Sequence, residues 1–247
     1  MRAIALVDLD DTLFQTLGKC PPDVAVEALA PIGYAADGSP LSYATPRQLS
    51  FLAWISESAL LVPVTARSRD ALERVRISWS SAICAHGGMI LDGGGVADQR
   101  WRARMAAEAG AHAESLAALS ERVAAEAGDA PIRVRVLEEE QVPLYVLAKH
   151  GSGDAEALAA VVDRVVPEVP AGWTVHRNGN NAAFLPPFLG KEHAVAWLLP
   201  ELRRRHPDAP VIGIGDSLTD APFMRLCDFA MMPTGSQLAA AAFARAA

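Results

Sequence analysis

The segment AIALVDLDDT, residues 3–12, is the most informative stretch of this chain. Its first five residues are apolar, and a short apolar run that ends in carboxylates is typical of a buried parallel strand. Asp8 and Asp10 lie two residues apart, so both can approach one small site as the chain leaves the sheet. Two close carboxylates repel unless a cation separates them or one stays protonated, which indicates Mg²⁺ binding, acid–base chemistry or both. On this segment alone, residues 10–12 are equally well explained as a turn or a helix start.

Further apolar runs of the same kind recur along the chain. They are LLVPV (60–64), AICA (82–85), VIGI (211–214) and FAMM (229–232). Helices are expected between several of these runs, over residues 46–57, 69–75 and 192–204. The first of them has Thr45 as its N-cap and Pro46 at its first position. Alternating strands and helices predict an α/β fold with a doubly wound, mostly parallel, Rossmann-like sheet whose site lies at the carboxyl ends of the strands.

This alternation breaks in the middle of the chain, between the glycine-rich residues 92–95 and the proline-rich residues 185–190. The pattern predicts a helix, two strands, a second helix and a hairpin, over residues 102–127, 132–137, 144–148, 154–166 and 173–186. We therefore predict an inserted α+β domain at residues 94–187, carried on a core formed by residues 1–93 and 188–247.

Composition excludes several classes of protein. The chain has 247 residues, 51% of them hydrophobic, and a formal charge of -7, so it has material for a packed core but no positive field for nucleic acid. No apolar run is long enough for a membrane span, and two Asp interrupt the N-terminal apolar segment. The three scattered cysteines fit neither a disulfide framework nor a CxxC metal site. We expect a cytoplasmic monomer or homodimer that binds neither nucleic acid nor membranes.

Four short motifs together resemble the haloacid dehalogenase superfamily. They are Asp8-x-Asp10-x-Thr12, Thr65 in VPVTARS, Lys191, and GDSLTD at residues 215–220. The insert lies between the second and third motifs, as in C2 caps, and its order is similar to the smaller C2B caps of Cof-type and sucrose-phosphatase-like hydrolases. The resemblance covers nearly the whole chain. A single Thr or Lys carries little weight, whereas four motifs in order are specific.

The resemblance implies a phosphatase with a covalent intermediate. In it Asp8 attacks phosphorus and becomes an aspartyl phosphate, and Asp10 acts as general acid and then as general base. Mg²⁺ is expected to be held by the carboxylates of Asp8 and Asp216 and by the backbone carbonyl of Asp10. The pKa of Asp10 then has to be tuned upward, because this carboxyl must first donate a proton.

Phosphate binding is expected from Lys191, from the hydroxyl of Thr65, and from the backbone N–H groups of Thr65 and Ala66 next to a helix start. Asp220 lies four residues after Asp216 on the expected helix, so it is a candidate partner of Lys191 or of a metal-bound water. A surface helix carboxylate is the alternative. Thr219 stands where many C2-capped relatives have Asn, which puts a direct phosphate contact from that side chain in doubt.

Substrate contacts have four weaker candidates: Arg67, His86, Arg177 and Asn181. Arg67 is equally well explained by a surface salt bridge, and His86 by a turn. Arg177 and Asn181 belong to a polar hairpin tip that suits either sugar hydroxyls or an ordinary tight turn. Residues 17–45, rich in Pro and Gly, are a candidate flap.

The prediction that results is a Mg²⁺-dependent phosphomonoesterase that acts on a small phosphorylated metabolite, in particular a sugar phosphate. One alternative is a phosphomutase of the phosphomannomutase type, in which a sugar hydroxyl takes the phosphoryl group instead of water. Another is a catalytically silent binding domain of the same fold. A dehalogenase is disfavoured, because Asp10 and the phosphate-binding residues would have no purpose in that reaction.

Overall fold

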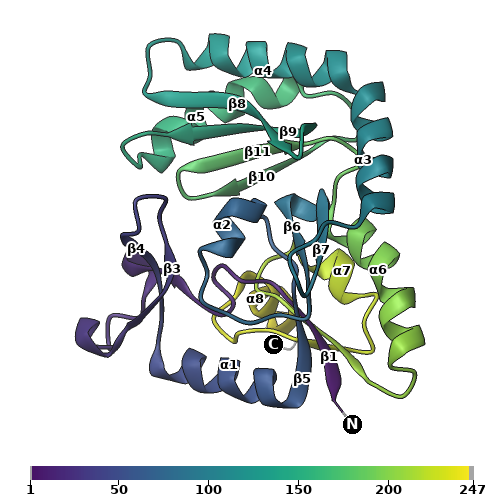
Figure 1. The fold of residues 1–247 in the computed structure, drawn as a ribbon. Coiled ribbons are helices and arrows are strands. Elements are labelled where there is room, and N and C mark those ends of the chain that lie inside the picture. Colours follow the sequence, from purple (N-terminus) through teal and green to yellow (C-terminus); the bar gives the residue numbers. More distant parts are fainter. Residues whose placement is uncertain (1, 245–247) are drawn as a thin grey trace. The chain divides into compact units, whose positions relative to one another are not determined.

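The structure, a computed structural model, describes residues 2–244 (Figure 1). It divides into a core unit, Met1–Asp98 with Lys191–Ala247, and an insert unit, Gln99–Gly190. The insert unit begins five residues later and ends three residues later than the predicted range 94–187. Residues 94–98 stay with the core unit because Ala97 forms a bridge with Leu91 and the Asp98 N–H donates to Ile90 O.

The core unit is built on a parallel sheet with the strand order β13-β12-β1-β5. The bounds are β1 Ala3–Val7, β5 Ala59–Pro63, β12 Val211–Ile214 and β13 Phe229–Met231. A parallel bridge between Val64 and Ile83 adds β6 (Ser81–Cys84), which pairs antiparallel with β7 (Met89–Asp92). The direction of winding reverses beside β1, and such switch points are where α/β sheets bind ligands. The predicted doubly wound fold class is confirmed.

Short helices connect these strands. They are α1 Pro46–Ser58, α2 Arg69–Glu73, α6 Lys191–Arg205, α7 Ala221–Met224 and α8 Gln237–Phe243, with single 3₁₀ turns at Leu17–Lys19, Val26–Ala28 and Ala85–Gly87. The three helices predicted in this unit are present, with ends that differ by at most two residues. β1 is buried on both faces, as Ile4 to Val7 expose at most 1% of their surface, so its apolar run is explained by the core it forms.

Residues 17–45 contribute to a small antiparallel sheet in the order β2-β4-β3. The bounds are β2 Gln15–Thr16, β3 Ala30–Tyr34 and β4 Pro40–Ala44. Gln15 holds it at one edge, where Nε2 donates to Tyr43 O over 3.1 Å. The segment after the first motif is therefore a folded sheet, and it carries the buried side chain of Ser42.

The insert unit is a four-stranded antiparallel sheet, in the order β10-β11-β9-β8, with helices packed on one face. The bounds are β8 Ile132–Glu139, β9 Val142–His150, β10 Thr174–Asn178, β11 Asn181–Leu185, α3 Gln99–Ala111, α4 Ala113–Ala127 and α5 Ala155–Val165, with a 3₁₀ turn at Val166–Glu168. Leu116 and Val123 of α4 and Val162 of α5 pack with Val146 and Phe184 of the sheet. This packing explains the apolar spacing of both helices.

The single helix predicted over residues 102–127 is wrong. The chain forms α3 and α4 instead, and His112 between them leaves the helical conformation, with φ −109° and ψ 7°. Its Nδ1 lies 2.9 Å from Glu108 O, and its ring packs against Phe188 with centroids 5.1 Å apart. The side chain thus competes for a helix carbonyl while the apolar spacing continues across the break, so the pattern alone did not reveal it.

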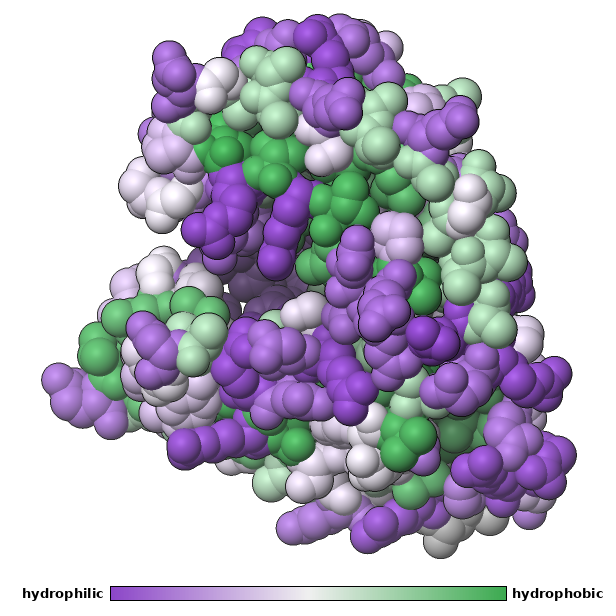
Figure 2. All heavy atoms as spheres, turned by 45° about the horizontal axis from the view of Figure 1, so that its top comes forward, coloured by the Kyte–Doolittle hydropathy of each residue, from purple (hydrophilic) through white to green (hydrophobic). Residues whose placement is uncertain are grey.

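Hydrophilic side chains cover much of the visible surface of both units, with apolar ones between them (Figure 2). Among residues 2–244, no helix combines the length and the apolar character that a bilayer span requires.

A capping box fixes the start of α1. Thr45 Oγ1 accepts from the Gln48 N–H over 3.2 Å, and Gln48 Oε1 accepts from the Thr45 N–H over 2.9 Å. Thr45→Ala is expected to lower the free energy of unfolding by about 1 kcal/mol, because the Gln48 N–H loses the side-chain oxygen that accepts from it. Urea unfolding followed by circular dichroism measures this. Ser50→Ala removes only an exposed bond to Pro46 O and is the matched control; equal losses in both variants would contradict the role of the cap.

Candidate active site

The first strand of the core sheet delivers Asp8. Val7 pairs with Pro63 on one side and Ile214 on the other, and the Asp8 N–H donates to Ile214 O over 2.8 Å. Asp8 therefore emerges where the winding reverses, and only 6% of it is exposed. The structure agrees with the expectation that this carboxylate lies at the carboxyl end of a buried central strand.

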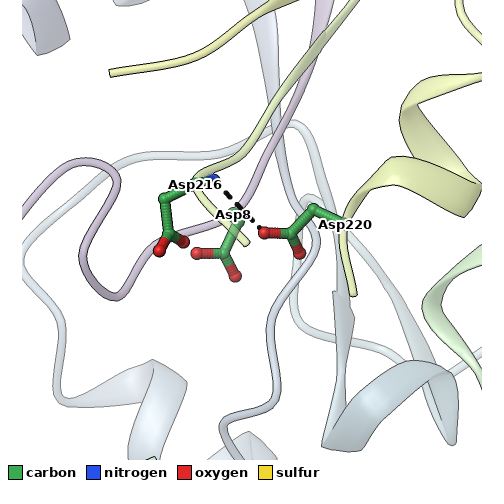
Figure 3. Close-up of side chains that lie close together, drawn as sticks. All are labelled: Asp8, Asp216 and Asp220. Atoms are coloured by element: carbon green, nitrogen blue, oxygen red, sulfur yellow. Dashed lines mark hydrogen bonds between the residues drawn. The ribbon is translucent and has the colours of Figure 1, made fainter. Parts of the chain in front are cut away.

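The loop after β12 brings Asp216 and Asp220 beside Asp8 (Figure 3). Asp220 Oδ2 accepts from the N–H of Asp216 over 3.2 Å and of Ser217 over 3.0 Å, which holds the loop in a tight turn. Gly215 permits this turn, since a Cβ there would lie 2.6 Å from Asp220 Cβ. The prediction that Asp216 and Asp220 share a helix is wrong: α7 begins only at Ala221, with Asp220 at its N-cap.

Lys191, the first residue of α6, joins two of these carboxylates. Its Nζ donates to Asp8 Oδ1 over 2.6 Å and to Asp220 Oδ1 over 2.7 Å. Burial disfavours the ammonium, but the two carboxylates outweigh it, so the pKa of Lys191 is raised and the side chain is cationic. Asp220 thus contacts Lys191, which is one of the two partners predicted for it; a metal-bound water is the other.

Asp8, Asp216 and Asp220 form a candidate metal centre. One oxygen from each lies within 4.8 Å of the others, and Thr12 Oγ1 lies 3.1 Å from Asp8 Oδ2 and 3.2 Å from Asp216 Oδ1. Three carboxylates against one ammonium leave two negative charges. Hard carboxylate oxygens and this charge suit Mg²⁺. The side chain of Asp10 is not in this cluster, and its predicted contribution is through a backbone carbonyl.

Burial and crowded negative charge raise the pKa values of two carboxyl groups in the cluster. Burial raises the pKa of Asp8 to about 7, with further increases from Asp220 and Asp10 and an opposing effect of Lys191. Burial, Asp220 and Asp11 raise the pKa of Asp216 to about 6. A divalent cation would relieve this repulsion and favour both carboxylates.

Arg67 contacts Asp10. Its Nε donates to Asp10 Oδ2 over 2.8 Å and its Nη2 to Oδ1 over 2.7 Å, a bidentate ion pair. Nη2 also donates to Ser42 Oγ over 3.0 Å, and the guanidinium lies over the Phe14 ring. Arg67 thus forms its ion pair with Asp10, the predicted proton carrier, and not with a carboxylate on a helix surface. Ser42 was missed by the sequence analysis, because a lone serine in residues 17–45 carries no signal.

Thr65 is fully buried beside this pair. Its N–H donates to Ile83 O over 2.9 Å, so the prediction that this amide binds an anion is wrong. The same prediction for the Ala66 N–H stays a prediction. Thr65 Oγ1 accepts from the Arg67 N–H over 3.1 Å, which leaves the hydroxyl proton available. The hydroxyl is therefore the phosphate-binding group that Thr65 can offer.

Two residues that contact the Thr65 loop have a strained backbone. Ala85 and His86 have φ of 50° and 55°, a left-handed conformation that costs non-glycine residues about 1–2 kcal/mol each. The Ala85 N–H donates to Arg67 O over 2.6 Å and the His86 N–H to Thr65 O over 3.2 Å. His86 is buried and shapes this turn, which ties β6 to the loop that carries Thr65 and Arg67.

The remaining candidates do not contact these carboxylates directly; Thr219 reaches Asp220 through Ser217 Oγ, which donates to Asp220 Oδ2 over 3.0 Å, and the other two lie in the insert unit. Thr219 is exposed and its Oγ1 lies 2.6 Å from Ser217 Oγ. Arg177 forms an ion pair of 2.7 Å with Asp163 of α5. Asn181 Nδ2 donates to Asn180 Oδ1 over 3.1 Å in the hairpin turn. Arg177 is thus engaged on the helix side of the insert sheet.

Comparison with solved structures finds a similar arrangement of elements in several proteins. A sucrose-phosphatase from Synechocystis, in complex with sucrose and phosphate, is 16% identical with a TM-score of 0.52, over 99% of this chain and 88% of the other. A trehalose-6-phosphate phosphatase related protein is 19% identical with a TM-score of 0.50, over 93% and 86%. A Thermoplasma acidophilum protein is 12% identical with a TM-score of 0.56, over 98% and 89%. The chain shares their fold.

This likeness confirms the fold that the resemblance to sucrose-phosphatase-like hydrolases implied. No family model and no curated protein matches the sequence.

Asp216→Asn is expected to stabilise the metal-free protein. The pKa of Asp216 rises from 3.8 to about 6 on folding, so the stability linked to its protonation is complete below pH 3.8 and is lost as the pH rises through about 6. Asparagine does not ionise, so the advantage of the variant grows over this window. It reaches about 1 kcal/mol at pH 8, allowing for solvent screening of a half-exposed carboxylate. Urea unfolding in EDTA at pH 4, 6 and 8 measures it.

Mg²⁺ is expected to reverse this order at pH 8, because it binds the folded wild-type protein more tightly than the variant. Asp70→Asn, at an exposed carboxylate of α2 that pairs with Arg74, is the matched control, and its small difference from the wild type should not change when Mg²⁺ is added. An Asp216→Asn protein less stable than wild type in EDTA at pH 8 would contradict the repulsion.

Proposed function

We propose that this protein is a Mg²⁺-dependent phosphomonoesterase that acts through an aspartyl phosphate on Asp8. The observation that carries the proposal is the buried contact of Lys191 with Asp8 and Asp220, beside Asp216, at the switch point of the sheet. A nucleophilic carboxylate, a fixed cation and a candidate metal centre meet there. These are the groups that phosphoryl transfer requires.

Lys191 and Asp8 act together in the proposed reaction. The ammonium fixes Asp8 Oδ1 and supplies positive charge beside the oxygen that attacks phosphorus. Asp8, Asp216 and Asp220 would hold Mg²⁺, which neutralises charge on the transferring phosphoryl group. The hydroxyl of Thr65 donates to a phosphate oxygen. The bond from phosphorus to the ester oxygen breaks as the bond to Asp8 forms.

Asp10 is the proposed proton carrier. It donates a proton to the leaving alcohol and, once ionised, takes one from the water that hydrolyses the aspartyl phosphate. Arg67 holds its carboxylate by both oxygens, which suits the ionised state needed in the second half of the reaction. Proton donation in the first half requires Asp10 to leave this ion pair or to be protonated within it.

The proposed substrate is a small phosphorylated metabolite, in particular a sugar phosphate. The shared fold with a sucrose-phosphatase and with a trehalose-6-phosphate phosphatase related protein supports this choice.

The purified protein is expected to release phosphate from p-nitrophenyl phosphate and from sugar phosphates when Mg²⁺ is present. EDTA should abolish turnover. Asp8→Asn should lower kcat by at least about 1,000-fold, because an amide is a far weaker nucleophile than a carboxylate. Phosphate release measured over a substrate panel tests this.

Asp70→Asn, an exposed Asp-to-Asn change, controls for unspecific loss. Positional isomers formed without phosphate release would show a phosphomutase instead. A fully active Asp8→Asn protein would overturn the mechanism, and a wild-type protein inert on the whole panel would overturn the function.

A further inference from the structure

Helix α1, at the periphery of the core unit, presents an apolar stripe on its outer side (Figure 1). Ile55 is buried on the inner side, whereas Leu49, Ala53 and Trp54 are exposed. Trp54 exposes 50% of its surface, and the other four tryptophans of the chain are buried or half-buried. Its ring stacks on Phe51 with centroids 5.8 Å apart, which restricts its motion. A large side chain that is both ordered and exposed is typical of the centre of a protein interface.

One charge lies at each end of this stripe. Because α1 runs from Pro46 to Ser58, Arg47 is in its first turn and Glu57 is in its last. They are the two charged residues of the helix, and both are exposed. Within residues 2–244 neither of them forms an ion pair. The apolar stripe is therefore bounded by one unpaired cation and one unpaired anion.

These two charges do not stabilise the helix that carries them. A helix has partial positive charge at its N-terminus and partial negative charge at its C-terminus, so anions are favourable in the first turn and cations in the last. Arg47 and Glu57 are placed the other way round. They are also too far apart for the pairing over one turn that Arg69 and Glu73 make in α2. Their placement becomes favourable when opposite charges of another molecule face them.

The pattern of α1 is complementary to itself. Arg47 and Glu57 lie five residues before and after Leu52, and Ser50 and Trp54 lie two residues before and after it. A two-fold axis at the level of Leu52 sets two antiparallel copies of the helix side by side. Arg47 then faces Glu57 of the partner subunit, and Trp54 lies over Ser50 of the partner subunit. Each cation meets an anion and each large side chain meets a small one, as an isologous contact requires.

We propose that the protein forms a homodimer in which two copies of α1 pack antiparallel. Leu49, Ala53 and Trp54 supply most of the affinity, because exposed ion pairs contribute little in water. The two pairs of Arg47 with Glu57 set the register and the direction of the helices. One helix from each chain buries less area than a standard interface, so we expect a reversible dimer with a dissociation constant in the micromolar range. The inference goes beyond the proposed phosphatase function and does not depend on it.

Charge reversal tests the register. Arg47→Glu brings two carboxylates together at both ends of the interface, and Glu57→Arg brings two cations together. Each variant alone is expected to raise the dissociation constant at least about tenfold at low ionic strength, measured by sedimentation velocity over a concentration series. An equimolar mixture of the two variants should dimerise as the wild type does, because every cation in the mixed dimer again faces an anion. The double variant should also dimerise.

The controls separate the interface from folding and from net charge. Both reversals agree with the helix dipole, so the variants are expected to melt no lower than the wild-type monomer. Arg225→Glu makes the same change of net charge at an exposed residue that follows α7, and it should leave the dissociation constant unchanged. Trp54→Ala removes the largest apolar contact and should give a folded monomer, with circular dichroism as the check on folding.

The outcomes decide the inference in both directions. Loss of the dimer in each single variant together with its recovery in the mixture supports the antiparallel pairing, because unspecific adhesion of an exposed tryptophan predicts no recovery. A wild-type protein that stays monomeric up to about 100 µM overturns the inference. So does a dimer that Trp54→Ala leaves intact, or one that is not recovered in the mixture. Sedimentation does not require phosphate release, so the proposed function can hold or fail separately.

Discussion

The ammonium of Lys191 between Asp8 and Asp220 is the interaction on which the core unit depends at its switch point. Both carboxylates are almost fully buried, and burying a charge without a partner costs several kcal/mol. A side chain from α6 offsets that cost for residues that follow β1 and β12, so three distant parts of the sequence have to fold together before the site exists. Even so, the one ammonium does not neutralise all three carboxylates. The negative charge that remains makes the cluster a candidate site for a divalent cation.

Around this cluster the backbone is held in costly geometry. Gly215 allows a turn in which Asp220 approaches the main chain, and Ala85 with His86 adopts a left-handed conformation to reach Arg67 O and Thr65 O. Strain of this kind persists only where neighbouring contacts over-determine it. Its effect is that Arg67 and Thr65 are positioned by β6, a strand that carries no charged residue of its own.

The sequence predicted what depends on local pattern. The apolar runs gave the strands, Thr45 and Pro46 gave the start of α1, and the motif order gave the residues that meet at the carboxyl ends of β1 and β12. It did not predict the break at His112, because the apolar spacing of α3 and α4 continues across it. Nor did it predict the partners of Arg67, since the ion pair with Asp10 and the hydrogen bond to Ser42 join residues that lie far apart in the sequence.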